Sequence, residues 1–227
     1  MQPDTFNSKI RSHIINHKLL YPFDLLLVGA TGAGKSSTIN AIFGSPQAKI
    51  GEGVDPETQE VHSYTVGEYF RVHDSAGLGD GASADLRHAK NITQKLLEPI
   101  QIGGQQYGLI DMALVILDGS SRDLGTAFKL LQTVVTQTIQ ADRIAVAINQ
   151  ADMAMKGRNW DPVLNRPNKI LADYLKEQAE AIQRRVFEST NCNLKLPITY
   201  SAKHNYNIDC LVDHVISCIP TTRRKIV

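Results

Sequence analysis

Short apolar runs alternate with longer amphipathic stretches along most of this chain. Apolar runs of about four to eight residues between turn-forming residues predict buried strands, and apolar residues three or four positions apart predict helices. The strands are expected at 24–28, 61–66, 69–73, 110–117, 143–148 and 196–200. The helices are expected at 37–43, 84–100, 125–140, 170–187 and 207–219. This order predicts an α/β fold in which a six-stranded, mostly parallel sheet with one antiparallel strand carries helices on both faces.

The two ends of the chain lie outside this alternating pattern. Apolar residues recur at helical spacing near the start, at Ile10, Ile14, Ile15 and Leu19. The sequence therefore predicts an N-terminal helical extension over 1–22, a central domain over 23–220 and a basic tail over 221–227. We expect the N-terminal helix to pack against an edge of the sheet, and the alternative is docking onto a partner or a membrane surface.

A phosphate-binding loop is indicated where the first predicted strand meets the first predicted helix. Residues 29–36 read G-x-x-x-x-G-K-S, in the strand–loop–helix setting that such a loop requires. Its glycines allow successive backbone N–H groups to point inward at an anion. Lys35 is expected to reach the β- and γ-phosphates, and the Ser36 hydroxyl to bind Mg²⁺. The residues expected to contact the nucleotide are Gly29, Thr31, Gly32, Ala33, Gly34, Lys35, Ser36 and Ser37.

A second loop with phosphate chemistry follows the third predicted strand. Ligands of such sheets bind at the carboxyl ends of the strands, so the loops at these ends should carry the function. Residues 74–77 read D-S-A-G. Asp74 is expected to hold Mg²⁺, and the Gly77 N–H to meet a γ-phosphate.

Recognition of a base is indicated at the ends of the fifth and sixth predicted strands. Asp152 can accept hydrogen bonds from both the ring and the exocyclic N–H groups of guanine, a pairing that adenine cannot reproduce. Asn149 is expected to tie this loop back to the phosphate loop. Ser201, Ala202 and Lys203 follow the sixth strand, and the Ala202 N–H is expected to donate to the oxygen of the base.

Charge and composition narrow the class of protein. The 24 basic residues nearly cancel the 23 acidic ones, which argues against a dedicated nucleic-acid binder. The chain has no apolar run of about eighteen residues and no signal-peptide pattern at its start, so we expect a cytoplasmic protein without a membrane span. The cysteines at 192, 210 and 218 are expected to be small thiols rather than metal or redox groups.

The four motifs, in this order and at these strand ends, resemble the signature of the translation-factor-related GTPases over residues 24 to about 219. The sequences GATGAGKSSTINAIF and DSAGLGD are most similar to the Era, septin and interferon-inducible side of that class. The resemblance implies a Ras-like P-loop G domain with GTP or GDP, Mg²⁺ and two switch loops. Thr58 matches the switch threonine that closes on Mg²⁺ and the γ-phosphate. The implied catalytic residues are Lys35, Thr58 and Gly77, and the implied magnesium ligands are Ser36, Thr58 and Asp74.

Three positions depart from the pattern of these GTPases. Gln150 stands where they have a lysine that covers the base, and Leu78 where Ras-like enzymes have a glutamine that orients water. Gly32 stands where some Era-like enzymes have an asparagine that binds potassium. The sequence therefore predicts a GTP-binding switch that hydrolyses GTP slowly with Mg²⁺ and without potassium activation. The alternative is a nucleotide-dependent interaction module with negligible hydrolysis.

Partners and three remaining side chains complete the prediction. The resemblance implies an effector protein or the ribosome as a partner, and a homodimer that forms with nucleotide. His73 and His62 are interpreted first as hydrogen-bonded structural histidines, with general-base catalysis as the alternative. Trp160 is expected to pack the long loop at 153–169 onto the domain, with anchoring of a partner as the alternative.

Overall fold

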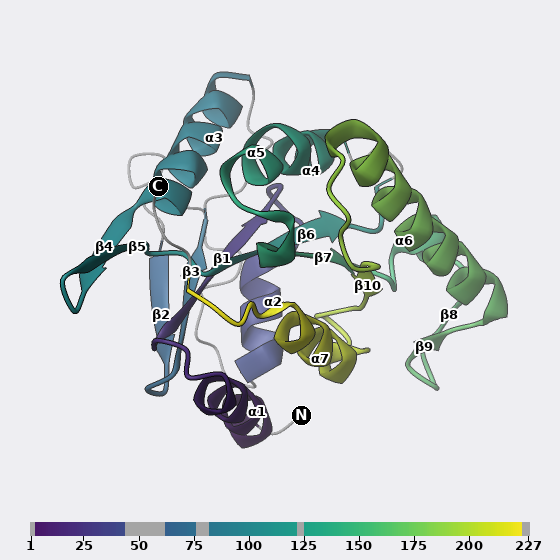
Figure 1. Ribbon diagram of the computed structural model, residues 1–227. Coiled ribbons are helices and arrows are strands. Elements are labelled where there is room, and N and C mark those ends of the chain that lie inside the picture. The colour runs from purple at the N-terminus through teal and green to yellow at the C-terminus, as the bar shows by residue number, and fades with distance from the viewer. Residues whose placement is uncertain (1–2, 44–61, 76–81, 122–124, 224–227) are drawn as a thin grey trace.

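The computed structural model describes residues 3–43, 62–75, 82–121 and 125–223 (Figure 1). Its main element is a six-stranded sheet with the strand order β10-β7-β6-β1-β3-β2. Neighbouring strands are parallel except β2, which pairs antiparallel with β3, so the expected sheet is confirmed. The strands are β1 (Phe23–Gly29), β2 (His62–Val66), β3 (Phe70–Asp74), β6 (Met112–Asp118), β7 (Ile144–Asn149) and β10 (Ile198–Thr199).

Helices cover both faces of this sheet, which is why its central strands are apolar on both sides (Figure 1). On β1, Leu25 and Leu27 face one core while Leu26 and Val28 face the other, following the two-residue period of a strand. The first core is completed by α1 (Pro3–Asn16), α2 (Lys35–Phe43) and α7 (Ile208–Cys218). The second is completed by α3 (Ala82–Leu97), α4 (Gly125–Leu130), a π-helical turn η1 (Leu131–Val135) and α6 (Lys169–Thr190).

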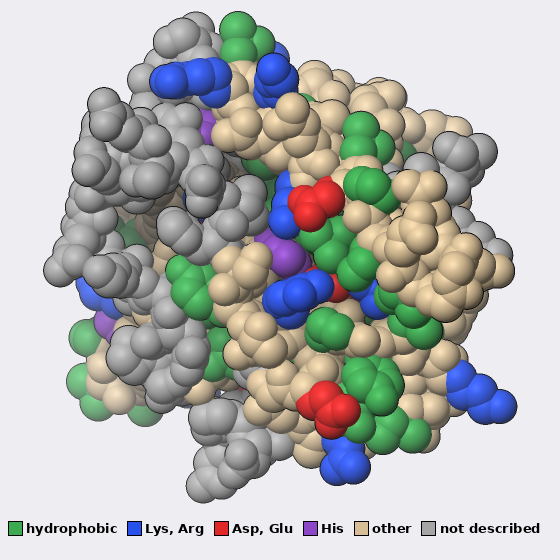
Figure 2. All heavy atoms as spheres, turned by 90° about the vertical axis from the view of Figure 1, so that its left-hand side faces the viewer, with side chains coloured by type: hydrophobic (Ala, Val, Ile, Leu, Met, Phe, Trp, Pro, Cys, Tyr) green, Lys and Arg blue, Asp and Glu red, His purple; other side chains and the backbone are tan. Residues whose placement is uncertain are grey.

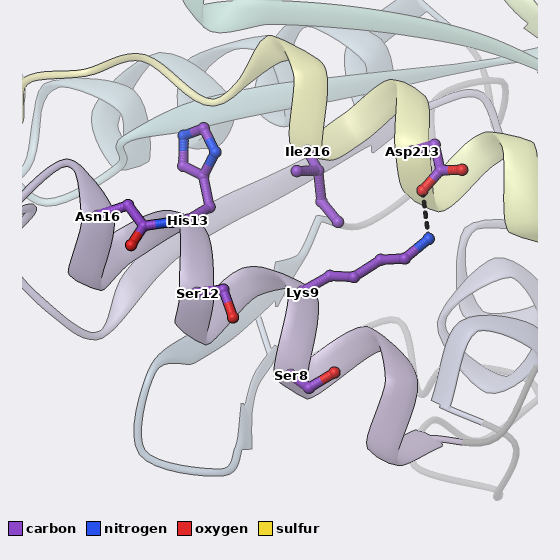
Figure 3. A pocket seen from close by; sticks show the side chains of 7 residues that line it. All are labelled: Ser8, Lys9, Ser12, His13, Asn16, Asp213 and Ile216. Atoms are coloured by element: carbon purple, nitrogen blue, oxygen red, sulfur yellow. Dashed lines mark hydrogen bonds and ion pairs between the residues drawn. The ribbon is translucent and has the colours of Figure 1, made fainter.

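Helix α1 is the helix expected before the first strand, but it packs mainly against α2 and α7 and not, as expected, against an edge of the sheet. Its Ile10 and Ile14 side chains are buried in the first core. Lys9 Nζ forms an ion pair of 2.6 Å with Asp213 Oδ1 of α7 (Figure 3). The two helices border a cleft of about 350 Å³, and the side chains along it come from α1 and α7 (Figure 3). This cleft lies on the surface between the two helices.

The helix expected at 84–100 ends earlier than its apolar spacing predicted. Helix α3 stops at Leu97, and Pro99 begins a hairpin of β4 (Pro99–Ile102) and β5 (Gln105–Gly108). Proline cannot continue a helix because it lacks the N–H and its ring clashes with the preceding turn. The turn of the hairpin consists of two glycines with positive φ angles of 58° and 80°. The last residues of the predicted helix were therefore wrong.

Two other segments carry detail that periodicity did not predict. The helix expected at 125–140 is divided by η1 and resumes as the short α5 (Thr136–Thr138), after which comes the 3₁₀ turn η2 (Ala141–Arg143). The loop at 153–169 contains the 3₁₀ turn η3 (Ala154–Gly157) and a small ribbon of β8 (Trp160–Asp161) and β9 (Arg166–Pro167).

A buried ionic cluster lies near the amino-terminal ends of β1 and β6. Asp24 Oδ1 accepts hydrogen bonds from Arg71 Nε (2.5 Å) and His73 Nε2 (2.8 Å), and its Oδ2 accepts one from an Arg223 guanidinium N–H (2.9 Å). Asp111 Oδ2 accepts from the Asp24 N–H at 3.0 Å, and its Oδ1 lies 3.4 Å from Arg223 Nε. Arg223, at the end of the described chain, is thereby held against the domain.

The surface mixes charges of both signs. Figure 2 shows the face at the left of Figure 1, where the described basic and acidic side chains stand among hydrophobic and other ones. Neither sign of charge forms a continuous area among the described residues of this face. This distribution agrees with the near balance of 24 basic and 23 acidic residues in the sequence.

Candidate nucleotide site

The phosphate loop connects β1 to α2, and two of its glycines have no room for a side chain. A Cβ atom at Gly29 would lie 2.6 Å from the Ile116 carbonyl oxygen of the neighbouring strand. Gly34 has a φ angle of 86°, and a Cβ atom there would lie 2.2 Å from Asn149 Nδ2. The loop therefore closes tightly at the amino end of α2, where backbone N–H groups and the helix dipole favour an anion.

The first two residues of α2 supply charge and oxygen to this loop. Lys35 is buried, and its Nζ donates to the carbonyl oxygens of Gly29 (3.1 Å) and Ala30 (3.2 Å). Ser36 Oγ donates to Asp74 Oδ2 at the end of β3 (3.0 Å). A hydroxyl and a carboxylate are oxygen ligands of the kind that Mg²⁺ prefers. The side chains present therefore fit a nucleotide phosphate group together with a magnesium ion.

Asn149, the last residue of β7, links the loops at three strand ends. Its Nδ2 donates to the Ala33 carbonyl (2.9 Å), so the expected tie to the phosphate loop is present. Its Oδ1 accepts from the Ala202 N–H (3.0 Å). That N–H is the one expected to donate to the oxygen of a bound base, and in this structure it donates to Asn149. This bond holds the loop after β10 to β7.

Gln150 contributes a contact that the sequence did not predict. Its φ angle is positive, at 60°, and its Nε2 donates to the Gly32 carbonyl (2.7 Å). The residue was interpreted only as the loss of a lysine that covers the base. In the structure its amide adds a second bond between the β7 loop and the phosphate loop, beside the one that Asn149 makes. The replacement of the usual lysine by glutamine did not by itself indicate this contact with Gly32.

Asp152 offers a buried acceptor beside these loops. Its side chain is 4% exposed, and its Oδ1 has no hydrogen-bond partner among the described residues. Its Oδ2 lies 3.5 Å from His204 Nε2. A buried carboxylate oxygen without a donor is costly, and a ligand with N–H groups would relieve that cost. The arrangement therefore suits a base that presents donors, as guanine does.

A buried hydroxyl pair supports the floor of the site. Thr38 Oγ1 donates to the Gly34 carbonyl and lies 2.7 Å from the Tyr200 hydroxyl, which joins α2 to the end of β10. Burial raises the pKa of Tyr200, so this hydroxyl stays neutral. Of the three residues that follow it, Ser201 is fully buried, Ala202 is buried and Lys203 is exposed.

The structure thus brings most of the predicted site residues to one edge of the sheet. Thr31 is exposed and Ser37 half-buried at the phosphate loop. Thr58 and Gly77, two of the three predicted catalytic residues, lie outside the described residues, as does Leu78. His73 is buried between Asp24 Oδ1 and Ser63 Oγ, which agrees with a structural histidine.

Trp160 packs within the domain, as expected. Its ring meets Tyr206 edge-on at 5.2 Å between centroids and lies 5.5 Å from the ring of His204. Its contacts join the β8–β9 ribbon to the loop after β10. The histidine in this cluster was not singled out from the sequence, and only its position directly after Ser201, Ala202 and Lys203 could have drawn attention to it.

Fold and site together define a P-loop nucleotide-binding domain of the Ras-like kind. Residues 24–186 match the family of 50S ribosome-binding GTPases, and the chain belongs to this family. The chain is therefore a GTPase domain, the class of protein that binds guanine nucleotide and hydrolyses GTP. The alternative of a binding module with negligible hydrolysis is not favoured.

Individual relatives give further comparisons. A segment of 80 residues is 36% identical to Translocase of chloroplast 125 of Physcomitrium patens, and it covers 34% of this chain and 7% of that protein. The chain thus spans a small part of this relative. A dimerization-deficient variant of Toc33 from Arabidopsis thaliana has a TM-score of 0.67 at 13% identity, covering 100% of this chain and 97% of that one. An Era variant from Aquifex aeolicus bound to GDP and AlF4⁻ has a TM-score of 0.55 at 17% identity, covering 87% and 56%.

At these identities the two solved structures are evidence for the shared fold. They do not by themselves assign a branch within the family. Within the described part of the chain, the helices are too short or too polar to span a membrane.

Proposed function

We propose that this chain is a slowly hydrolysing GTP switch that recognises guanine through Asp152. The observation that carries the proposal is the pair of bonds from Asn149 to the Ala33 carbonyl and the Ala202 N–H. They fix the phosphate loop and the two base loops to one another. Beside them stands the Asp152 Oδ1 atom, buried and without a donor among the described residues.

The residue roles follow from these positions. Lys35 and the backbone N–H groups of the phosphate loop bind the β- and γ-phosphates, and Ser36 and Asp74 hold the magnesium ion. Bound magnesium would neutralise charge on the phosphate oxygens. Thr58 and Gly77 are proposed to close on the γ-phosphate. Asp152 accepts the two N–H groups of guanine, and Asn149 positions the loop that carries it.

Equilibrium binding of a fluorescent GDP analogue tests the phosphate site. Lys35→Ala removes a charge-assisted contact of about 1.5–3 kcal/mol, so affinity should fall at least about tenfold. Lys9→Ala is the matched control, because it removes a lysine of α1 that pairs with Asp213 on α7. Equal affinities for Lys35→Ala and the unaltered protein would show that the loop does not bind the phosphates.

A nucleotide-dependent homodimer is the second part of the proposal. Dimerization is important for the GTPase activity of the chloroplast translocon components atToc33 and psToc159, whose solved structure is similar to this chain. The match to that structure has a TM-score of 0.63 at 14% identity and covers 96% of this chain and 92% of that one. We propose that a second copy of this chain faces the switches and supplies the group that Leu78 cannot.

Branch, partner and location complete the proposal. The Era side of the family is supported by the phosphate-loop and D-S-A-G-L-G-D sequences, and an effector protein or the ribosome as a partner by the description of the family. The cytoplasmic location stays a prediction from the sequence.

A further inference from the structure

We propose that His204 is a positioning residue for guanine recognition, which acts by holding the Asp152 carboxylate in the orientation that receives the base. The proposal rests on the assignment of Asp152 to guanine. His204 lies directly after Ser201, Ala202 and Lys203, on the loop that follows β10. Its Nε2 atom is 3.5 Å from Asp152 Oδ2.

The two oxygens of Asp152 stand in different surroundings. Oδ2 faces the imidazole nitrogen, and Oδ1 is buried without a donor among the described residues. A carboxylate that is anchored through one oxygen cannot turn freely about its last torsion, so its other oxygen keeps a fixed direction. Each carboxylate oxygen carries two lone pairs, so Oδ2 can face His204 and still accept one N–H group of guanine.

The position of the imidazole is itself fixed from three sides. The His204 N–H donates to Ser201 Oγ (3.2 Å), and the His204 carbonyl accepts from Asn165 Nδ2 (2.8 Å). The ring lies against Trp160, with centroids 5.5 Å apart and planes tilted by 43°. Trp160 is held in turn by the edge-on ring of Tyr206. The β8–β9 ribbon thus supports the base site through a histidine.

This support would compensate for the absence of the lysine that covers the base in related GTPases. Gln150 stands at that position, and its side-chain amide donates to the Gly32 carbonyl of the phosphate loop. In its place, a donor on the opposite loop fixes the acceptor that distinguishes guanine from adenine. His204 is therefore expected to affect the choice of base more than the binding of phosphate.

Two substitutions separate positioning by the donor from packing of the ring. His204→Phe keeps an aromatic ring against Trp160 and removes the donor, whereas His204→Gln keeps an amide N–H near the place of Nε2 and removes the ring. The measurement is competition of GDP and ADP against a fluorescent GDP analogue. Because the readout is a ratio of two affinities on folded protein, a loss of stability cancels from it. His17→Phe, in the turn that follows α1, controls for removal of a histidine.

We expect His204→Phe to lower the preference for GDP over ADP about fivefold, the scale of a partly exposed ion pair, and His204→Gln to keep most of it. In an Asp152→Ala background, His204→Phe should have no further effect on the ratio, because its action passes through that carboxylate. An unchanged or increased GDP preference in His204→Phe, or a loss in His204→Gln alone, would overturn the inference. If the unaltered protein itself lacked a GDP preference, the assignment of Asp152 would fail instead.

Discussion

At the scale of single residues, the phosphate loop needs glycine for two different reasons. Some positions need it because a side chain would clash with a neighbour, and others only because the backbone has a positive φ angle. Gly32 and Gly34 both have positive φ angles, of 78° and 86°. A Cβ atom at Gly32 would meet nothing within 4 Å, whereas one at Gly34 would lie 2.2 Å from Asn149 Nδ2. The two positions form a matched pair, because they share the backbone strain and differ in the clash.

Gly32→Ala should cost about 1 kcal/mol of stability, the strain of a left-handed residue that carries a Cβ. Gly34→Ala should cost about 1–3 kcal/mol more, because it displaces Asn149 from its two buried hydrogen bonds. Urea unfolding of the nucleotide-free proteins measures both changes. Equal losses for the two variants would mean that Asn149 adapts and does not link the loops.

The sequence predicted the Asn149 tie and singled out Asp152, because their motif has a known place at the end of a strand. It did not predict the contact from Gln150 or the position of His204. Gln150 meets a carbonyl 118 positions away in the chain, and His204 meets a side chain 52 positions away. Such pairs come together only once the strand order is fixed, and a single sequence without a motif carries no sign of them.

At the scale of elements, the ionic cluster binds Arg223 to the sheet and makes the stability of the fold depend on pH. Burial raises the pKa of the Asp111 carboxyl to about 7, against about 3.9 in an unfolded chain. Between these values the folded state keeps a proton that the unfolded state has released. Stability from this group is therefore full below about pH 4 and lost as the pH rises through about 7.

Asp111→Asn should remove this dependence while its amide oxygen can still accept from the Asp24 N–H. The stability of the unaltered protein relative to Asp111→Asn should fall by about 1 kcal/mol per pH unit between about pH 5 and 7. Denaturant unfolding at several pH values gives this difference, and the exposed Asp142→Asn is the control. A difference that stays constant or rises with pH would contradict the assignment.

The elements themselves were predicted where burial on both faces leaves uninterrupted apolar runs, as on β1, β6 and β7. The β4–β5 hairpin was missed because apolar residues at helical spacing continue past Pro99 to Ile100. The two glycines that form the turn of the hairpin come only after that residue. The cluster around Asp24 was missed for a different reason. A charged residue at the start of an apolar run looks like a strand end facing solvent, and its partners Arg71 and Arg223 lie far along the chain.

At the scale of the whole molecule, the dilute protein should hydrolyse GTP slowly. Leu78 cannot orient water, and Gly32 offers no side-chain ligand to potassium. We expect a rate of about 10⁻⁴ to 10⁻³ per second, the intrinsic scale of a Ras-like domain without a helper, and similar rates in sodium and potassium. Single-turnover assays over a range of protein concentrations measure it.

Acceleration at high protein concentration is expected if a second copy completes the site. A rate above about one per second in the dilute protein, or a tenfold effect of potassium, would mean that the chain carries a catalytic group of its own beyond those proposed. A slow rate that is independent of concentration would contradict the homodimer and leave a partner of another kind as the helper.

The most direct test of guanine recognition is the base preference of Asp152→Asn. The exchange replaces one acceptor oxygen with a donor amide, which repels the N–H groups of guanine and suits the extra carbonyl of xanthine. Competition of GTP, ATP and XTP for the unaltered protein and the variant is the measurement. The account predicts that the unaltered protein selects GTP and that the variant selects XTP. A variant that still prefers GTP by the original ratio would contradict it.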